Sequence, residues 1–312
     1  MKKVNNTFSR RKFFKQSAGV SVGVGAAIAG VGGLKGRLEA ADKALGSAGL
    51  KGRIKHSACK WCYNKIPLDD LCTAGKKFGL RSVELLLPKD FATLKKHGMH
   101  CAMVSFPQGE TSKGVKVGGI TRAFNRLEHH DTLVEIYEPH IKASAEAGFK
   151  NVICFSGNRE GLDDGQGIKN CAAGLKRLLP LAEKLGVTIS MELLNSKVNH
   201  KDYQCDHTTW GVALCDEIGS ENFKLLYDIY HMQIMEGDVI ATIREYHPYI
   251  SHYHTGGVPG RHEIDDSQEL NYPAIMKAVV DTGHKGWVAQ EFIPAREDKI
   301  ASLKQGVEIC DV

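Results

Sequence analysis

Short apolar runs alternate with longer amphipathic segments along the chain after residue 50. The short runs have the length of buried strands, and the longer segments repeat apolar residues at the spacing of one helix face. Eight strands are predicted, at 54–60, 81–86, 100–106, 151–156, 188–194, 223–229, 251–255 and 286–292. The predicted helices include 68–78, 131–147, 167–185, 209–218, 238–246, 272–282 and 298–310. Strands that alternate with helices indicate a parallel α/β sheet.

The number of these units favours one closed (β/α)₈ barrel, because eight of them fit within the chain after residue 51. The alternative, an open doubly wound sheet, normally carries a glycine-rich phosphate turn after an early strand. Neither G-x-G-x-x-G nor G-x-x-x-x-G-K-[ST] occurs here. Polar and apolar residues also alternate strictly along 188–193, so the polar ones share one face of the strand. The interior of a barrel can hold such a face.

The first 41 residues differ from the rest of the chain. They comprise a basic head, a glycine-rich apolar stretch at 18–34 and a small-residue exit at Ala40 and Ala41. The head contains S-R-R-K-F-F-K at 9–15, which resembles a twin-arginine export signal. The apolar stretch is shorter than the roughly 20 residues of a membrane span. We therefore expect a signal peptide at 1–41, a linker at 42–51 and the barrel at 52–312. The resemblance implies delivery by the twin-arginine machinery to the periplasm, with an uncleaved membrane anchor as the alternative.

Charge is distributed unevenly between the head and the rest of the chain. The 312 residues carry a net charge of +5, with 41 basic and 36 acidic residues. Residues 1–41 hold eight of the basic residues and one acidic residue, which leaves 33 and 35, a net charge of −2. A nucleic-acid-binding surface needs a basic excess in the folded part. We therefore expect no nucleic-acid partner.

Nine cysteines are scattered along the chain, several of them in apolar runs, which favours buried free thiols. A hydrophobic content of 42% and a charged content of 25% fit an ordinary globular domain. The pair Cys59-x-x-Cys62 is the exception to consider, as a redox pair or half of a zinc site. No second CxxC accompanies it.

Four candidate metal ligands fall late in the last four predicted strands: Glu192, Asp228, His254 and Glu291. The carboxyl ends of barrel strands meet at one rim, so these side chains are predicted to converge. Three carboxylates packed together raise one another's pKa unless a cation neutralises them. With one imidazole they suit a single divalent ion, Mn²⁺ or Mg²⁺ first, with Co²⁺ or Zn²⁺ as alternatives. The competing interpretation is that each acid caps a helix or pairs with a lysine.

Further polar residues lie near these ligands in the sequence. His231 follows Asp228 by three residues, and Arg261 lies in the loop after the seventh strand. An arginine fork binds a carboxylate at two points, and a histidine donates to a substrate oxygen, so both are candidate substrate-binding residues. His252 shares strand parity with His254, and Glu84 ends the second strand. These two are candidates either for the site or for a supporting role in the core.

Four segments of the last hundred residues make the chain resemble the xylose isomerase-like barrels, and within them the hydroxypyruvate isomerases and ketose 3-epimerases. They are L-L-Y-D-I-Y-H-M-Q-I-M-E-G-D at 225–238, H-Y-H-T-G-G-V-P-G-R-H-E at 252–263, E-L-N-Y-P at 269–273 and G-W-V-A-Q-E-F-I-P-A at 286–295. The resemblance implies metal ligation by Glu192, Asp228, His254 and Glu291, and substrate contacts from His231 and Arg261. It also implies acid and base roles for Glu192 and Glu291.

The activity that the resemblance implies is the isomerisation of hydroxypyruvate to tartronate semialdehyde through an enediolate. The expected partner is therefore a small hydroxy-keto acid or a sugar, and a homo-oligomer is compatible with the sequence. The chain departs from many hydroxypyruvate isomerases at His254, where they carry Gln, and at 264–268, where their loop contains glycine. A periplasmic ketose 3-epimerase is accordingly the alternative. A non-catalytic sugar-binding protein and a DNA-repair endonuclease of the same barrel family are the remaining ones.

Overall fold

The computed structural model of the protein describes residues 49–312. The predicted signal peptide at 1–41 lies outside the described residues, as do residues 42–48 of the predicted linker. Within 49–312, strands and helices alternate as the hydrophobic pattern predicts, and the fold is a TIM-barrel-like α/β fold. None of the helices in this range combines the length and the apolar character that crossing a membrane requires.

Seven strands form one parallel sheet in the order β2-β1-β9-β8-β7-β6-β5. Their bounds are β1 Lys55–Cys59, β2 Ser82–Glu84, β5 Asn151–Cys154, β6 Thr188–Glu192, β7 Phe223–Asp228, β8 Ile250–Thr255 and β9 Trp287–Gln290. The first and last strands pair directly, with Lys55 opposite Trp287. The two ends of the described chain therefore meet inside the sheet, as they do in a barrel.

The predicted third strand at 100–106 is wrong as a regular strand, because the structure has only isolated bridges there. His100 bridges to Ser82 of β2, and Val104 bridges both to Leu86 and to Val152 of β5. The segment thus connects the two edge strands of the sheet. Its ladder is interrupted where the main-chain N–H of Ala102 donates to the hydroxyl of Ser82 at 2.9 Å instead of to a carbonyl of the neighbouring strand.

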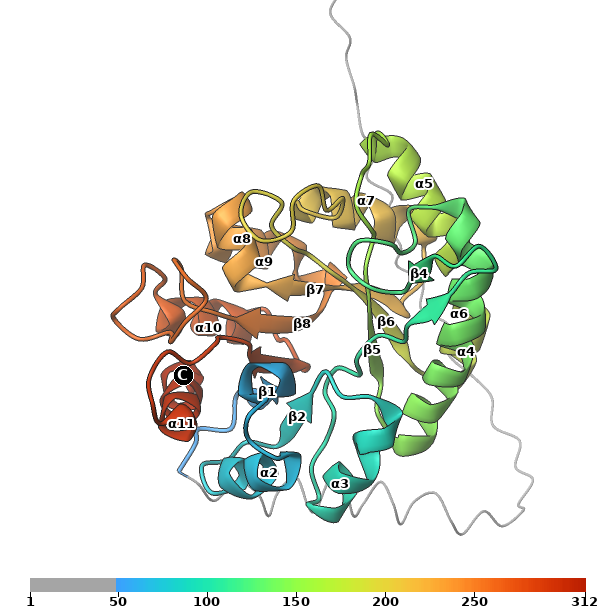
Figure 1. The fold of residues 1–312 in the computed structure, drawn as a ribbon. Coiled ribbons are helices and arrows are strands. Elements are labelled where there is room, and N and C mark those ends of the chain that lie inside the picture. Colours follow the sequence, from blue (N-terminus) through green and yellow to red (C-terminus); the bar gives the residue numbers. More distant parts are fainter. Residues whose placement is uncertain (1–48) are drawn as a thin grey trace, which may run out of the picture. The chain divides into compact units, whose positions relative to one another are not determined.

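Helices cover the outside of the sheet (Figure 1). The α-helices are α2 Leu68–Lys76, α3 Phe91–Lys96, α4 His130–Ala147, α5 Asp164–Leu175, α6 Leu179–Leu185, α7 Thr208–Ile218, α8 Ile229–Met235, α9 Val239–Tyr246, α10 Tyr272–Asp281 and α11 Lys299–Cys310. Short 3₁₀ helices are η1 Lys60–Tyr63, η2 Pro88–Asp90, η3 Leu127–His129 and η4 His247–Tyr249. A small antiparallel hairpin joins β3 Gly109–Glu110 to β4 Lys116–Val117.

The prediction of one continuous helix at 167–185 is wrong, because two helices occupy that range. α5 ends at Leu175, and α6 begins at Leu179 with Pro180 in its first turn. Proline has no N–H and clashes with the preceding turn, so it is tolerated at the start of a helix and not in its interior. The pattern also does not predict α3, α8 or the hairpin.

The core between the sheet and the helices is apolar, and its side chains are buried from solvent. Fully buried side chains include Val83, Ile153 and Leu225 from the strands, and Leu71 and Leu214 from the inner helix faces. All nine cysteines are free thiols, eight of them buried and one, Cys62, partly buried. This confirms the expectation of buried free thiols.

Candidate active site

The structure brings together the four predicted ligands at the carboxyl ends of four adjacent strands. Glu192 and Asp228 are the last residues of β6 and β7, His254 is the next to last residue of β8, and Glu291 follows β9 directly. One ligand atom from each side chain lies within 4.8 Å of all the others. All four residues are buried, Asp228 and His254 completely. Their convergence follows from the parallel strand register, in which Asp228 stands opposite His254.

Burial and the neighbouring charges set the electrostatics of this cluster. Burial raises the pKa of Asp228 and of Glu192, because desolvation penalises their charged forms. Burial would also raise the pKa of Glu291, but His254 and Arg261 beside it hold that pKa well below its usual range. The charged forms of Asp228 and Glu192 are therefore disfavoured in the cluster, and a bound cation would stabilise them.

The cluster fits one divalent cation, as two of its atoms indicate. Nδ1 of His254 and Oε1 of Glu192 are buried and form no hydrogen bond among the described residues, although Nδ1 lies 2.6 Å from Oε2 of Glu291 and 3.4 Å from Oε1 of Glu192. Buried polar atoms normally find a partner, and a cation placed among these ligands would provide one. Carboxylate oxygens with one imidazole nitrogen suit Mn²⁺, Mg²⁺, Co²⁺ or Zn²⁺. The donor set therefore supports a metal site and leaves the identity of the ion open.

Arg261 provides a cation within the site itself. Its Nη2 lies 3.0 Å from Oδ2 of Asp228 and 2.6 Å from Oε2 of Glu291. The guanidinium carbon lies 5.2 Å from the centres of the Trp61 and Tyr230 rings, a distance typical of cation–π contacts. The sequence predicts Arg261 as a substrate-binding residue in a loop. The structure places it against the candidate metal ligands with its side chain 12% exposed, which makes it part of the same site.

His231, the other predicted substrate-binding residue, is completely buried beside Arg261. Its Nε2 lies 3.1 Å from Nη1 of Arg261, and its Nδ1 accepts a hydrogen bond from the main-chain N–H of Asn195 at 3.1 Å. Burial lowers the pKa of His231 well below its usual range, and the positive charge of Arg261 adds to that effect. The imidazole is therefore neutral at ordinary pH. Asp228 helps to place it by capping α8, since its Oδ1 accepts from the N–H of His231.

Trp61 belongs to the site, although the sequence reasoning did not select it. Its indole Nε1 donates a 2.7 Å hydrogen bond to Oε1 of Glu291, and its ring faces Arg261. A signal was available, because Trp61 lies just after the carboxyl end of β1, the end at which barrels carry their functional residues.

Glu84 and His252, whose role the sequence left open, lie next to His254. Oε1 of Glu84 lies 2.8 Å from Nε2 of His252 and 2.9 Å from Nε2 of His254, and all three side chains are fully buried. Burial would raise the pKa of Glu84, but the two imidazoles lower it to about 2. Cys59 also lies here, its Sγ 3.7 Å from Nε2 of His254.

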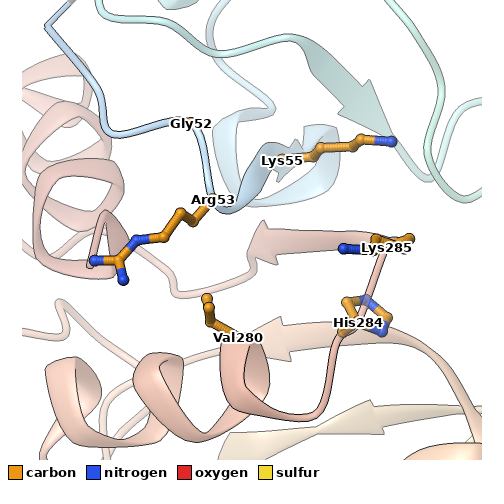
Figure 2. Close-up of a pocket in the computed structure, with 7 residues that line it drawn as sticks. Gly52, Arg53, Lys55, Val280, His284 and Lys285 are labelled. Atoms are coloured by element: carbon orange, nitrogen blue, oxygen red, sulfur yellow. The ribbon is translucent and has the colours of Figure 1, made fainter.

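A separate cavity of about 260 Å³ opens beside the amino-terminal ends of β1 and β9. Its lining includes three cationic side chains, Arg53, Lys55 and Lys285. Figure 2 shows that Arg53 and Lys55 extend in opposite directions, so these cations do not converge on one point. The cluster at the opposite ends of the strands is therefore the better candidate for a functional site.

Comparison with known families and proteins gives a consistent result. The model of the family described as "Xylose isomerase-like TIM barrel" matches residues 76–310. The chain is 34% identical over 113 residues to a putative hydroxypyruvate isomerase of Homo sapiens, and 38% identical over 109 residues to a 2-oxo-tetronate isomerase of Cupriavidus necator. These two matches cover 36% and 35% of this chain and span only 40% and 41% of those proteins.

A longer match is the hydroxypyruvate isomerase of Escherichia coli, 28% identical over 225 residues, which covers 69% of this chain and 84% of that protein. Among solved structures, an AP endonuclease of family 2 from Brucella melitensis has a TM-score of 0.68 at 24% identity, covering 81% of this chain and 97% of that one. A 3-keto-D-glucoside 4-epimerase from E. coli has a TM-score of 0.66 at 18% identity, covering 82% and 98%. At these identities the structural likeness shows the fold alone.

Proposed function

The chain belongs to the xylose isomerase-like TIM barrel family, and we propose that it is a metal-dependent isomerase of the hydroxypyruvate isomerase type. The named isomerases to which it is similar support this class of enzyme. The observation that carries the proposal is the cluster of Glu192, Asp228, His254 and Glu291 at one rim, with Arg261 in contact with two of the carboxylates. Hydroxypyruvate, which becomes tartronate semialdehyde, is the proposed substrate.

The four clustered side chains would hold one divalent ion. When bound, such an ion polarises a carbonyl oxygen and the neighbouring hydroxyl oxygen of the substrate, which acidifies the hydrogen on carbon. The proposed isomerisation moves the carbon-bound proton from C3 to C2 and the hydroxyl proton from the C3 oxygen to the C2 oxygen, and it leaves the carbon skeleton unchanged. One glutamate takes the proton from C3 of hydroxypyruvate, which leaves an enediolate, and a proton is then returned to C2. C3 thereby becomes the aldehyde, and C2 becomes the carbon that bears the hydroxyl.

Glu192 and Glu291 are the proposed acid and base. Their carboxylates face opposite electrostatic surroundings, since burial raises the pKa of Glu192 while His254 and Arg261 lower that of Glu291. Two carboxyl groups with pKa values moved apart are suited to different roles in one proton transfer. Trp61 orients Glu291 through its indole N–H at 2.7 Å.

Arg261 and His231 are the proposed substrate-binding pair. The guanidinium lies against the rings of Trp61 and Tyr230, 5.2 Å from each ring centre, so little side-chain freedom is lost when it binds a substrate carboxylate at two points. His231 is neutral, and its Nε2 lies 3.1 Å from Nη1 of Arg261, so a second polar side chain lies beside the guanidinium. An acidic substrate is therefore favoured over a neutral one.

A ketose 3-epimerase is the second candidate, and the observation that favours it is His254. An imidazole at this position departs from many hydroxypyruvate isomerases, which carry Gln, and is similar to the ketose epimerases. Both reactions begin with the removal of the same type of proton, and they differ in where the proton returns. Return to the same carbon from the opposite face gives the epimer.

We further propose that residues 1–41 direct export to the periplasm through the twin-arginine machinery. The motif S-R-R-K-F-F-K at 9–15 supports this proposal.

A proton-exchange assay in D₂O tests the proposed function directly. Purified protein loaded with Mn²⁺ is incubated with hydroxypyruvate and, separately, with a panel of free ketoses, and deuterium at carbon is followed by NMR. We expect deuterium in hydroxypyruvate together with the appearance of tartronate semialdehyde. Exchange in ketoses alone would establish the epimerase instead, and no exchange in any hydroxycarbonyl compound by the metal-loaded protein would refute both.

A further inference from the structure

Beneath the proposed metal ligands, Glu84 contacts two histidines of one strand. Glu84 is the last residue of β2, and His252 and His254 lie two residues apart on β8, so they share one face of that strand. β1 and β9 separate β2 from β8 in the sheet. The contacts of 2.8 and 2.9 Å therefore run across the interior of the fold and not between neighbouring strands.

The position of Glu84 determines which nitrogen of His254 carries hydrogen. A carboxylate only accepts hydrogen bonds, so Nε2 of His254 must donate to Oε1 of Glu84. A metal ion binds only the neutral imidazole, so when an ion is bound the other nitrogen, Nδ1, carries the lone pair. Nδ1 faces the carboxylates of the cluster, 2.6 Å from Oε2 of Glu291 and 3.4 Å from Oε1 of Glu192.

His252 fixes Glu84 in turn. A fully buried carboxylate is costly without donors, and Oε2 of Glu84 has no hydrogen-bond partner within residues 49–312. Both imidazole N–H groups converge on Oε1, with the thiol of Cys59 as a third and longer contact at 3.8 Å. The rings of His252 and His254 meet edge to face, with centroids 5.0 Å apart and an interplanar angle of 86°. Glu84 is thus held in place by a donor that does not belong to the ligand cluster.

We propose that Glu84 and His252 are positioning residues that hold His254 in the Nε2-protonated tautomer, with its Nδ1 lone pair directed at the metal site. The inference rests on the proposed function, since it concerns the metal that this function requires. Neither residue offers an atom to the cluster of Glu192, Asp228, His254 and Glu291. Their effect is therefore on the affinity for the ion. Hydrogen-bond partners of this kind change metal affinity about 10–100-fold when they are removed.

The test compares three variants by titrating metal-free protein with Mn²⁺ in a calorimeter. Glu84→Ala removes the acceptor, and we expect it to weaken Mn²⁺ binding about 10–100-fold at unchanged stoichiometry. Glu84→Gln keeps a carbonyl acceptor, so its loss should be smaller. Glu263→Gln is the matched control, because Glu263 is a buried carboxylate with several hydrogen-bond donors that does not contact His254. It should lower the Tm and leave the Mn²⁺ affinity unchanged.

A second measurement covers the case in which Glu84→Ala does not fold. Long-range ¹H–¹⁵N NMR spectra of the Zn²⁺-loaded wild type should show His254 with hydrogen on Nε2. A spectrum with hydrogen on Nδ1, or a folded Glu84→Ala that binds Mn²⁺ as tightly as the wild type, would overturn the inference. Asp228→Asn distinguishes a failure of this inference from a failure of the proposed metal site, because unchanged Mn²⁺ affinity in that variant would overturn the metal site itself.

Discussion

Replacing Arg261 with lysine tests the assignment of an acidic substrate. Lysine keeps the positive charge but loses the planar fork that can bind a carboxylate at two points. The Arg261 side chain simultaneously reaches Asp228, Glu291 and His231, at 2.6 to 3.1 Å. A compact ammonium group cannot reproduce these directions or the contacts with two aromatic rings. We therefore expect Arg261→Lys to alter both the substrate contact and the support of the carboxylates.

The two effects separate when two substrates are compared. One hydrogen bond to a charged group contributes about 1.5–3 kcal/mol, so losing one arm of the fork should reduce kcat/KM for hydroxypyruvate by a factor of roughly 10 to 150. A neutral ketose has no carboxylate, and its kcat/KM should fall only through the altered support of Asp228 and Glu291. The ratio of the two kcat/KM values isolates the substrate contact.

The assay is steady-state kinetics on both substrates, with Mn²⁺ content measured in every preparation. Arg296→Lys serves as the control, because Arg296 is a half-exposed arginine that pairs with Asp265 and is not among the residues of the ligand cluster. It should leave the ratio unchanged. An Arg261→Lys enzyme with the wild-type ratio at full metal occupancy would refute the role of Arg261 as the carboxylate-binding residue.

Four further predictions concern the ligands, the acid and base, a buried carboxylate and the export segment. Asp228→Asn should lower metal content far below that of the wild type by elemental analysis, and equal metal in an Asp228→Ala/Glu291→Ala double variant would place the ion elsewhere. Glu→Gln at Glu192 or at Glu291 should reduce kcat about 10²–10⁴-fold at matched metal occupancy, whereas a smaller loss would argue against proton transfer by that residue. Glu263→Gln should cost about 1–3 kcal/mol of unfolding free energy in denaturant titrations, because the carboxylate accepts from Ser302 and from two main-chain N–H groups. Burial would raise the pKa of Glu263, but these donors lower it. The contribution of Glu263 to the unfolding free energy is therefore fully present above the pKa of the unfolded state and disappears as the pH falls through the pKa of the folded state. A difference in stability between variant and wild type that does not change with pH would contradict this. Mass spectrometry of native exported protein should find an N-terminus near 40–50, and an intact N-terminus on membranes would indicate an anchor instead.

The strands and helices that follow a local repeat of apolar and polar residues could be predicted from the sequence. Seven of the eight predicted strands exist, and their carboxyl ends carry Glu192, Asp228, His254 and Glu291 together, because the rim of a barrel follows from strand order alone. The third strand could not be predicted correctly, since its interruption depends on the hydroxyl of Ser82 in another strand.

The remaining site residues depend on tertiary contacts that no local pattern contains. Arg261 adopts a positive φ of 59°, a backbone conformation uncommon for arginine, and only the folded loop shows that its side chain turns toward Asp228. Trp61 and Glu291 are 230 residues apart in sequence, and their contact needs the pairing of β1 with β9. The alternation of side chains along a strand predicts that His252 and His254 share one face, but it could not identify Glu84 as their common acceptor.

The contact of Glu84 with His252 and His254 has a consequence for the order of folding. The paired residues are 168 and 170 positions apart in the chain, so the carboxylate is synthesised long before either donor. A chain that ends before β8 contains Glu84 but lacks both histidines, and Glu291 follows later still. Contacts this distant in sequence form late, because the intervening loop must close first. Tight capture of the proposed metal ion would thus be a property of the finished barrel, and in a refolding experiment it should report completion of the fold and not its beginning.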